Sequence, residues 1–282
     1  MRIFILIACH NRADLTYRLL ESLENQHFDR NHALEVLAVD DGSTDNTAKV
    51  LESCRLVTET VYGSGDLYWA KSMGLAESIA LLKISQSAGS EQDYLLWLND
   101  DVQLDLHAIQ SSITAAEVNP NAIIVGKTIS KADGRLTYGP LVREGLHPLG
   151  FRLPSESEQV ETDAFNGNFV LIPFSAALKV GSIQTKYSHG MADIDYAIRA
   201  KKLGISIVVL QHPVGFCERN SPKRHSTRLS AWAEFIGKKG AGNPKSMLLL
   251  LKTSSRTWHL WMVATYVIWW MRRLKKAPYY LA

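Results

Sequence analysis

The sequence predicts an α/β protein with a mostly parallel sheet covered by helices on both faces, and three observations support this class. Apolar runs of five or six residues alternate with amphipathic stretches over residues 1–98, the order expected of strands joined by helices. Polar residues follow the ends of these runs, where parallel sheets bind ligands. The 282 residues, 46% of them hydrophobic and 21% charged, suit a large globular core and exclude a disordered or polytopic membrane protein.

The elements follow one another in a regular order. We expect strands at residues 3–8, 35–39 and 94–98, and helices at about 14–26, 44–53 and 70–84. From residue 123 to 173 the pattern is shorter and richer in Gly and Pro, with apolar runs at 123–125 and 168–172, which indicates a mixed second half of the sheet. A helix at about 193–203 stops before Gly204, a typical residue after a helix C-terminus, and a strand at 205–210 follows.

The segment from Asp40 to Asp45 reads Asp-Asp-Gly-Ser-Thr-Asp and follows the second expected strand. Locally it is a turn in which Ser43 or Thr44 caps the next helix, while Asp45 suits the positive end of that helix. Capping does not account for two adjacent carboxylates, Asp40 and Asp41, at the carboxyl end of a strand in a parallel sheet. There they can accept a hydrogen bond from a ribose hydroxyl or a pyrimidine ring N–H.

The three cysteines and the N-terminus indicate a compartment. Cys9, Cys54 and Cys217 are spaced too widely for a disulfide framework or a zinc motif. A reducing cytosol therefore suits the chain. Residues 1–9 are apolar but have no small-residue cleavage site, so they predict a first strand and not a signal peptide.

Three segments together resemble glycosyltransferase family 2. They are Ile-Ala-Cys-His-Asn-Arg at 7–12, Val-Asp-Asp-Gly-Ser-Thr-Asp at 39–45 and Leu-Trp-Leu-Asn-Asp-Asp-Val at 96–102. The similarity continues at 65–70, 166–168 and 189–200. It implies the GT-A fold over residues 1–218, a Rossmann-like mixed sheet flanked by helices. It also implies inverting transfer of a sugar from a nucleoside-diphosphate donor to a glycan or lipid-linked acceptor in cell-surface polysaccharide synthesis, as in members that transfer rhamnose.

In this family an Asp-x-Asp motif binds a divalent metal and the donor ribose, and the matching triplet here is Asn99-Asp100-Asp101. The resemblance therefore implies that Asp101, and after it Asp100, bind Mg²⁺ or Mn²⁺, which would neutralise the departing diphosphate. Asn99 brings an oxygen but no charge. His212 and His225 are candidates for a further ligand, although a histidine after a strand is more often structural. The plain alternative for the triplet is an ordinary turn.

The resemblance also implies the residues that bind the donor. Asp41, with Asp40, would hold the nucleoside, and Lys71 falls where many members place an arginine against the diphosphate. The glycine-rich loop before Lys71 lacks the spacing of dinucleotide-binding and P-loop motifs. The full donor set is Ala8, Asn11, Arg12, Asp40, Asp41, Asp66, Lys71, Asn99 and Asp100.

The transfer needs a base for the acceptor hydroxyl, and the family supplies an aspartate from a Glu-Asp-x-Asp pattern. This chain has Ala192-Asp193-Ile194-Asp195, without the Glu. Asp195 stands four residues before Arg199, the spacing of a helical ion pair. Asp193 has no such partner, so we assign it as the base, with helix capping as the alternative. The residues expected on the acceptor side are Asn166, Gly167, Asn168, His189 and Asp195.

Charge divides the chain near residue 218. Residues 1–218 carry 18 basic and 27 acidic side chains, whereas residues 219–282 carry 13 basic and one acidic, with five of the seven tryptophans. A Trp-rich apolar stretch at 257–271, followed by a basic cluster, is typical of a helix on an anionic membrane surface. We expect a peripheral protein on the cytoplasmic face of the membrane. A homodimer contact is the alternative, and no nucleic-acid motif is present.

Two other functions stay open. A sugar-phosphate nucleotidyltransferase would need a Gly- and Arg-rich loop after the first strand, and residues 7–12 contain no glycine. A non-catalytic, membrane-tethered scaffold is favoured by Asn99 and by the missing Glu before Asp193.

Overall fold

The computed structural model describes residues 1–29, 31–86, 92–155, 158, 161–187, 189–219, 225 and 227–274. These residues form a nine-stranded sheet in the order β3-β2-β1-β4-β11-β6-β12-β5, with β7 paired to β6. Its strands are β1 (Arg2–Cys9), β2 (Ala33–Asp40), β3 (Val57–Tyr62), β4 (Tyr94–Leu98), β5 (Gln103–Leu104), β6 (Ile123–Ile129), β7 (Leu136–Tyr138), β11 (Phe169–Pro173) and β12 (Ile207–Phe216). A small antiparallel sheet of β8 (Pro140–Arg143), β9 (Phe151–Arg152) and β10 (Ala164–Phe165) lies beside it.

The expected α/β class with a mostly parallel sheet is confirmed. β1 pairs in parallel with both β2 and β4, β2 pairs in parallel with β3, and β6 pairs in parallel with β12. The reversed strand β11 separates the two parallel halves, because it pairs antiparallel with β4 and with β6. The carboxyl ends of β1, β2 and β4 therefore meet at one edge, and this edge carries the polar segments that the sequence singled out.

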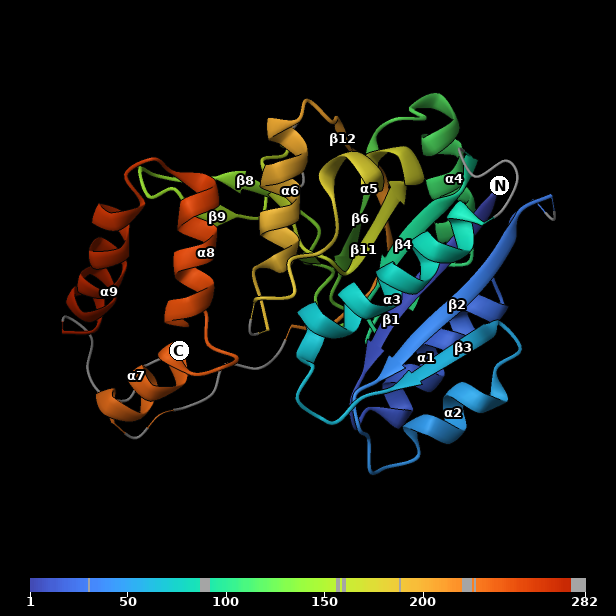
Figure 1. Cartoon of the computed structure of the whole chain (residues 1–282), viewed down its shortest axis with the longest axis horizontal. Helices are drawn as coiled ribbons and strands as arrows, with labels where there is room; N and C mark the ends of the chain where they lie inside the picture. Colours follow the sequence, from blue (N-terminus) through green and yellow to red (C-terminus); the bar gives the residue numbers. More distant parts are fainter. Residues whose placement is uncertain are drawn as a thin grey trace.

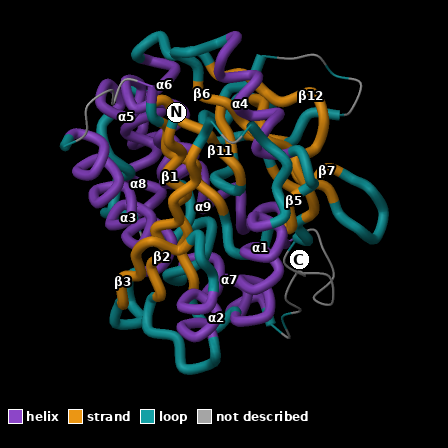
Figure 2. Tube along the Cα trace, turned by 90° about the vertical axis from the view of Figure 1, so that its right-hand side faces the viewer, coloured by secondary structure: helices purple, strands orange, loops and turns teal. Residues whose placement is uncertain are grey.

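Helices cover both faces of the sheet. Alternate residues of β1 point to opposite faces. Phe4 and Leu6 join the core under α3 (Tyr68–Ser85) and α6 (Ala192–Lys202), while Ile5 and Ile7 join the core under α1 (Ala13–Glu24) and α4 (Ala108–Val118). In Figure 2 the strands β1 and β2 lie between α3 and α1. The helices of the sheet domain are α1 (Ala13–Glu24), α2 (Thr47–Ser53), α3 (Tyr68–Ser85), α4 (Ala108–Val118), α5 (Phe174–Val180) and α6 (Ala192–Lys202).

The start of α2 differs from the expected one. The helix begins at Thr47, and neither Ser43 nor Thr44 caps it. Both are held by Asn11 instead: its backbone N–H donates to Ser43 Oγ at 2.9 Å, and its Oδ1 accepts from Thr44 N at 2.7 Å. Asp45 takes over the N-terminal role, because its Oδ1 accepts the backbone N–H of Thr47 at 2.9 Å.

The expected helical tail is also confirmed. It consists of α7 (Arg228–Ile236), α8 (Pro244–Ser254) and α9 (Trp258–Leu274), and Figure 1 shows α8 beside α6, with α7 and α9 farther from the sheet. An aromatic cluster joins α7 to α9; its members are Trp232, Phe235, Tyr266, Trp269 and Trp270. Within the described residues, no helix combines the length and apolarity needed to cross a bilayer.

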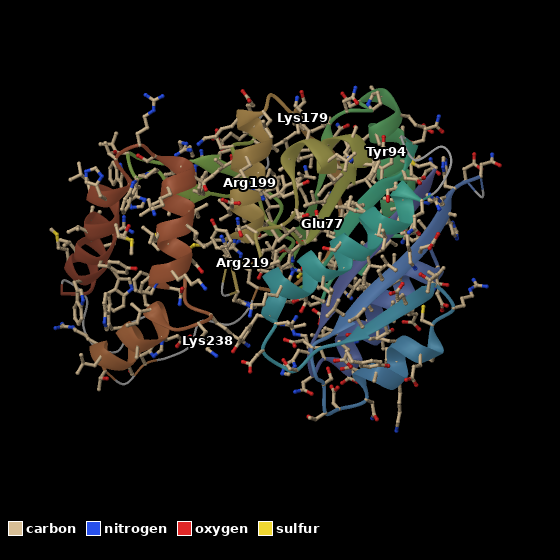
Figure 3. The ribbon with its side chains drawn as sticks, viewed as in Figure 1. Glu77, Tyr94, Lys179, Arg199, Arg219 and Lys238 are labelled. Atoms are coloured by element: carbon tan, nitrogen blue, oxygen red, sulfur yellow. The ribbon has the colours of Figure 1, made fainter. Side chains whose placement is uncertain are left out.

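Glu77 of α3 makes the stability of this fold dependent on pH. The side chain is completely buried, only its Oε2 accepts a hydrogen bond, from Ile183 N at 2.7 Å, and burial raises its pKa from 4.5 to about 7. Figure 3 labels Glu77 at α3. Below pH 4.5 the acid is neutral in both the folded and the unfolded chain. Between that pH and about 7 only the unfolded chain ionises, so the free energy of unfolding falls as pH rises.

We expect Glu77→Gln to remove this dependence. A pKa raised by this amount corresponds to roughly 3 kcal/mol of stability lost by pH 8. Urea unfolding at pH 5 and pH 8 measures it: the variant should gain stability over the wild type at pH 8 much more than at pH 5. The exposed-site variant Glu21→Gln is the control and should follow the wild type. An equal effect of Glu77→Gln at both pH values would contradict the assignment.

Candidate active site

A pocket of about 410 Å³ opens where the carboxyl ends of β1, β2 and β4 meet the start of α6. The structure brings ten of the expected site residues into its lining: Ala8, Arg12, Asp41, Asn99, Asp100, Asp101, Gly167, Asn168, His189 and Asp193. The donor-side and acceptor-side residues predicted from distant parts of the sequence thus face one cavity.

Eight other expected residues lie outside this lining: Asn11, Asp40, Asp66, Lys71, Asn166, Asp195, His212 and His225. Asp40 is buried, and its Oδ1 accepts the N–H of Ser43 at 2.9 Å, so it holds the turn. Lys71 is exposed on α3. His212 is exposed on β12, and His225 Nε2 lies 2.9 Å from Glu234 Oε2 of α7. Among the described residues, neither histidine forms a metal-binding group with Asp100 and Asp101.

Asp41 holds the loop that forms one wall of the pocket. Its Oδ1 accepts the N–H of Gly65 at 2.8 Å, and its Oδ2 accepts those of Leu67 and Tyr68 at 2.9 Å. Gly42 lets this loop come close: its φ is +69°, and a Cβ there would lie 2.8 Å from Gly65 N. The carboxylate therefore fixes the loop, a task in addition to the nucleoside contact expected from the sequence.

Asn99 accepts a hydrogen bond from Trp69 Nε1 at 2.8 Å. An amide oxygen meets this need without adding a third negative charge beside Asp100 and Asp101. The departure from the Asp-x-Asp motif therefore has a local structural reason.

Asp100 and Asp101 both form an ion pair with Arg12. Arg12 Nη1 lies 2.8 Å from Asp100 Oδ1 and 3.0 Å from Asp101 Oδ2. Asp100 is almost wholly buried, and burial raises its pKa to about 7 although Arg12 acts in the opposite direction. Asp101 is partly exposed to the pocket, and its Oδ1 also accepts from Cys217 Sγ at 3.5 Å.

These two carboxylates fit a divalent cation that is bound together with its substrate. Within the described residues, no group of three or more His, Cys, Asp or Glu side chains is arranged as a metal site. Mg²⁺, however, is commonly held by one or two carboxylates plus substrate phosphates. Asp100 and Asp101 each place one oxygen beside the same positive group, Arg12 Nη1. A cation held by these two oxygens would take its remaining ligands from a diphosphate.

Asp193 lies in the first turn of α6 and faces the same pocket. Its Oδ2 accepts the N–H of Gly167 at 3.0 Å, and its Oδ1 accepts that of Ile194 at 2.9 Å. A Cβ on Gly167 would lie 2.7 Å from the Trp69 ring and 3.4 Å from Asp193 Cβ, so only glycine lets this strand end approach. Burial raises the pKa of Asp193, and these N–H donors oppose the rise. A carboxylate with a raised pKa is a stronger base.

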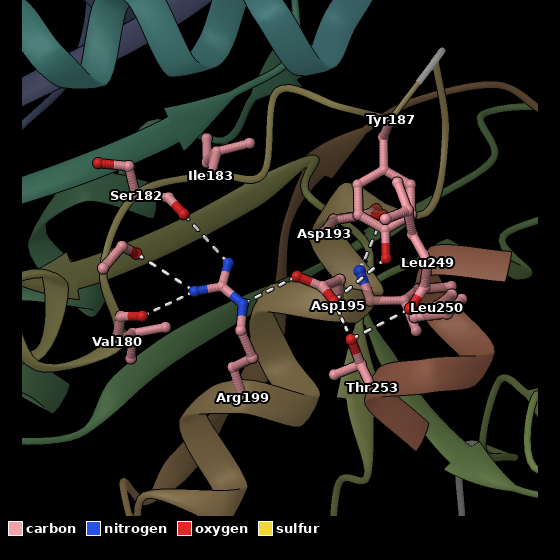
Figure 4. Close-up of polar contacts among 12 residues, drawn as sticks. Val180, Ser182, Ile183, Tyr187, Asp193, Asp195, Arg199, Leu249, Leu250 and Thr253 are labelled. Atoms are coloured by element: carbon pink, nitrogen blue, oxygen red, sulfur yellow. Dashed lines mark hydrogen bonds and ion pairs between the residues drawn. The ribbon is translucent and has the colours of Figure 1, made fainter. Parts of the chain in front are cut away.

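Asp195 lies two residues further along α6 and has a structural environment. The expected ion pair with Arg199 is confirmed, with Arg199 Nε 2.8 Å from Asp195 Oδ2. Asp195 Oδ1 accepts from Tyr187 Oη at 3.1 Å and from Thr253 Oγ1 at 2.8 Å (Figure 4). Thr253 belongs to α8, so this buried carboxylate connects the tail to the helix that carries Asp193.

Two basic residues of the pocket lining, His10 and Lys239, were not among the expected site residues. His10 lines the pocket, and its Nδ1–H donates to the carbonyl of Asp41 at 2.6 Å. Its place between Cys9 and Asn11 at a strand end was a usable signal. Lys239, in the turn between α7 and α8, also lines the pocket, and no motif in the sequence marks it.

The mixed sheet with helices on both faces and a polar pocket at its strand ends has the architecture of the GT-A fold. A family model described as glycosyl transferase family 2 matches residues 4–181. The chain therefore belongs to glycosyl transferase family 2.

Solved structures agree on the fold. TarS of S. aureus, residues 1–349, is 15% identical with a TM-score of 0.59, and the match covers 90% of this chain and 65% of that one. The mannosyltransferase PcManGT from Pyrobaculum calidifontis, in complex with GDP-Man and Mn²⁺, is 19% identical with a TM-score of 0.56, covering 89% and 64%. GalNAc-T7 with UDP, GalNAc and Mn²⁺ is 13% identical with a TM-score of 0.56, covering 77% and 44%. The chain thus spans less than two thirds of each of these chains. No curated protein sequence matches it.

Proposed function

We propose that the protein transfers a sugar from a nucleoside-diphosphate donor to a hydroxyl of a glycan or lipid-linked acceptor, with inversion at the anomeric carbon. One observation carries this proposal: Asp193, a half-buried carboxylate with a raised pKa, and the Asp100–Asp101 pair face a single pocket. A base and a diphosphate site on one cavity are what a single displacement requires.

Each residue has a defined task in this reaction. Asp193 takes the proton of the acceptor hydroxyl, and the N–H groups of Gly167 and Ile194 hold its carboxylate in place. The loop fixed by Asp41 forms the nucleoside side of the pocket. Asp101 and Asp100 would hold Mg²⁺ or Mn²⁺, which supplies positive charge to the leaving diphosphate. Complexes of PcManGT and GalNAc-T7 with Mn²⁺ support a divalent metal.

A thermal-shift panel tests the proposal. UDP-, dTDP- and GDP-sugars are compared with and without Mn²⁺, since a ligand that binds only the folded state raises the melting temperature. Stabilisation by one nucleotide class, dependent on Mn²⁺, is the expected result and identifies the donor. No stabilisation by any nucleotide sugar would contradict the proposed function.

We expect Asp101→Ala to abolish most of the Mn²⁺-dependent part of the donor-induced shift. The substitution removes the more accessible of the two carboxylates, leaving Asp100 alone beside Arg12. Asp133→Ala, on the exposed turn before β7, is the control and should keep the wild-type shift. An undiminished Mn²⁺ effect in Asp101→Ala would remove this residue from the metal site.

We further propose that α9 contacts an anionic membrane on its outer face, where a lipid-linked acceptor would be found. Leu260, Val263, Val267 and Met271 recur at helical spacing and are 62%, 65%, 49% and 53% exposed. The exposed Arg272 follows them directly. An apolar stripe next to basic residues is typical of a helix that lies in the membrane interface.

The double variant Val263→Asp/Val267→Asp should lose binding to vesicles that contain phosphatidylglycerol, measured by co-sedimentation. Neither substituted residue belongs to the aromatic cluster of α7 and α9, so the side chains of the cluster are unchanged in this variant. Truncation of the whole tail is less informative, because it also removes the contact of Thr253 with Asp195. Equal sedimentation of variant and wild type would place the membrane contact elsewhere, and a change in oligomeric state would favour the homodimer.

A further inference from the structure

Lys239 brings a positive charge from the tail into the pocket. It lines the same cavity as Asp101 and Asp193. Its Nζ lies 5.6 Å from the ring centroid of Tyr68, and this ring makes an edge contact with His189 at 6.0 Å. The neighbouring Lys238 faces the sheet domain (Figure 3), and its Nζ is 3.6 Å from Asp66 Oδ1.

The positive charge of Lys239 matters because of the state of the other basic side chains in the pocket. Four basic side chains occur in the described lining: His10, Arg12, His189 and Lys239. Arg12 is bound to Asp100 and Asp101. The pKa of His189 is lowered by burial and then by Lys239 and Arg12, so this ring is neutral at pH 7.

Lys71, the residue that the sequence placed against a diphosphate, does not bring its positive charge into the pocket. Lys71 is exposed on α3 and lies outside the lining. Lys239 has no carboxylate within ion-pair distance among the residues that the structure describes, whereas Lys238 is opposite Asp66. A lysine at the mouth of a pocket, close to an aromatic face and without a carboxylate, is suited to a phosphate.

We propose that Lys239 binds a phosphate group in this pocket, either the diphosphate of the donor or the phosphate of a lipid-linked acceptor. The inference rests on the proposed function and adds a residue to it. It also means that the segment after residue 218 completes the ligand site.

Calorimetric titration of the full chain tests this role with two pairs of probes, each with and without Mn²⁺. The first pair is the nucleoside diphosphate selected by the thermal-shift panel and its parent nucleoside. The second pair is farnesyl diphosphate and farnesol, which represent the lipid-linked source. Lys239→Ala should weaken binding of a diphosphate about tenfold, the worth of one charged hydrogen bond, and leave its phosphate-free counterpart unchanged.

Three comparisons make the result decisive. Lys239→Arg should keep the affinity, and Lys238→Ala is the matched control that should stay within about twofold of the wild type. A loss confined to the nucleoside diphosphate assigns Lys239 to the donor, and a loss confined to farnesyl diphosphate assigns it to the acceptor. If Lys239→Ala binds both diphosphates like the wild type, or if the wild type binds neither, the inference is wrong. If Lys239→Ala binds both diphosphates like the wild type, and the wild type binds the nucleoside diphosphate, only the role of Lys239 is wrong and the proposed function still stands.

Discussion

Asp193→Asn should lower the rate of sugar transfer by about 10²- to 10⁴-fold, the usual contribution of a general base, while donor affinity stays within about twofold of the wild type. The amide keeps one oxygen, which can accept from one of the two N–H groups of Gly167 and Ile194, but it cannot take a proton from the acceptor. Donor affinity is measured by calorimetry. Transfer is measured as release of nucleoside diphosphate from the donor, with a total lipid extract as the source of acceptor.

The pH profile gives a second readout for Asp193. The ionised carboxylate is the active form, and burial raises its pKa. Transfer should therefore fall on acidification at a higher pH than an exposed aspartate would give. Asp163→Asn, outside the pocket lining, is the control. An active Asp193→Asn would place the base elsewhere, and a wild type without transfer or donor hydrolysis would favour the non-catalytic scaffold.

The site was largely predictable because sheet topology converts sequence order into proximity. Strand ends at Arg12, Asp41 and Asp100 are far apart in the chain, but parallel pairing of β1 with β2 and β4 brings them to one edge. The alternation of apolar and polar residues was sufficient to locate these strands, and β4 spans Tyr94–Leu98 as expected.

Lys71 shows where reasoning from a motif alone was insufficient. Ala70, Met73 and Ala80 form the buried side of α3, so the helical period places Lys71 on the exposed side. The apolar periodicity contained this information, and the family position outweighed it in the prediction.

Lys239 shows a different limit. Its approach to Tyr68 depends on how the tail packs against the sheet domain, through the contact of α8 with α6. Such a contact is between segments distant in sequence, and no spacing or periodicity encodes it. The charge imbalance indicated that the tail binds an anion, but not that one of its lysines reaches the pocket.

Asp195→Ala should destabilise the protein by about 3 to 5 kcal/mol, the cost of breaking a buried ion pair. Asp195 is 3% exposed, and its loss leaves Tyr187 Oη, Thr253 Oγ1 and Arg199 Nε without their shared acceptor. Urea unfolding at pH 7 measures the change. The surface pair of Lys83 and Glu59 is the matched control, and Glu59→Ala should cost no more than about 1 kcal/mol.

Thr253→Val measures how much the tail contributes to the hydrogen bonds around Asp195. The substitution removes only the hydroxyl that α8 donates to Asp195, while Tyr187 and Arg199 keep their bonds (Figure 4). A charged hydrogen bond in a buried site is worth about 1.5 to 3 kcal/mol, so the variant should be clearly destabilised but less so than Asp195→Ala. Asp193 lies two residues before Asp195 on α6. Loosening the contact between Thr253 and Asp195 should therefore also lower the transfer rate without changing donor affinity. A stable Thr253→Val variant with full transfer activity would show that α8 merely covers α6 and does not hold it in position.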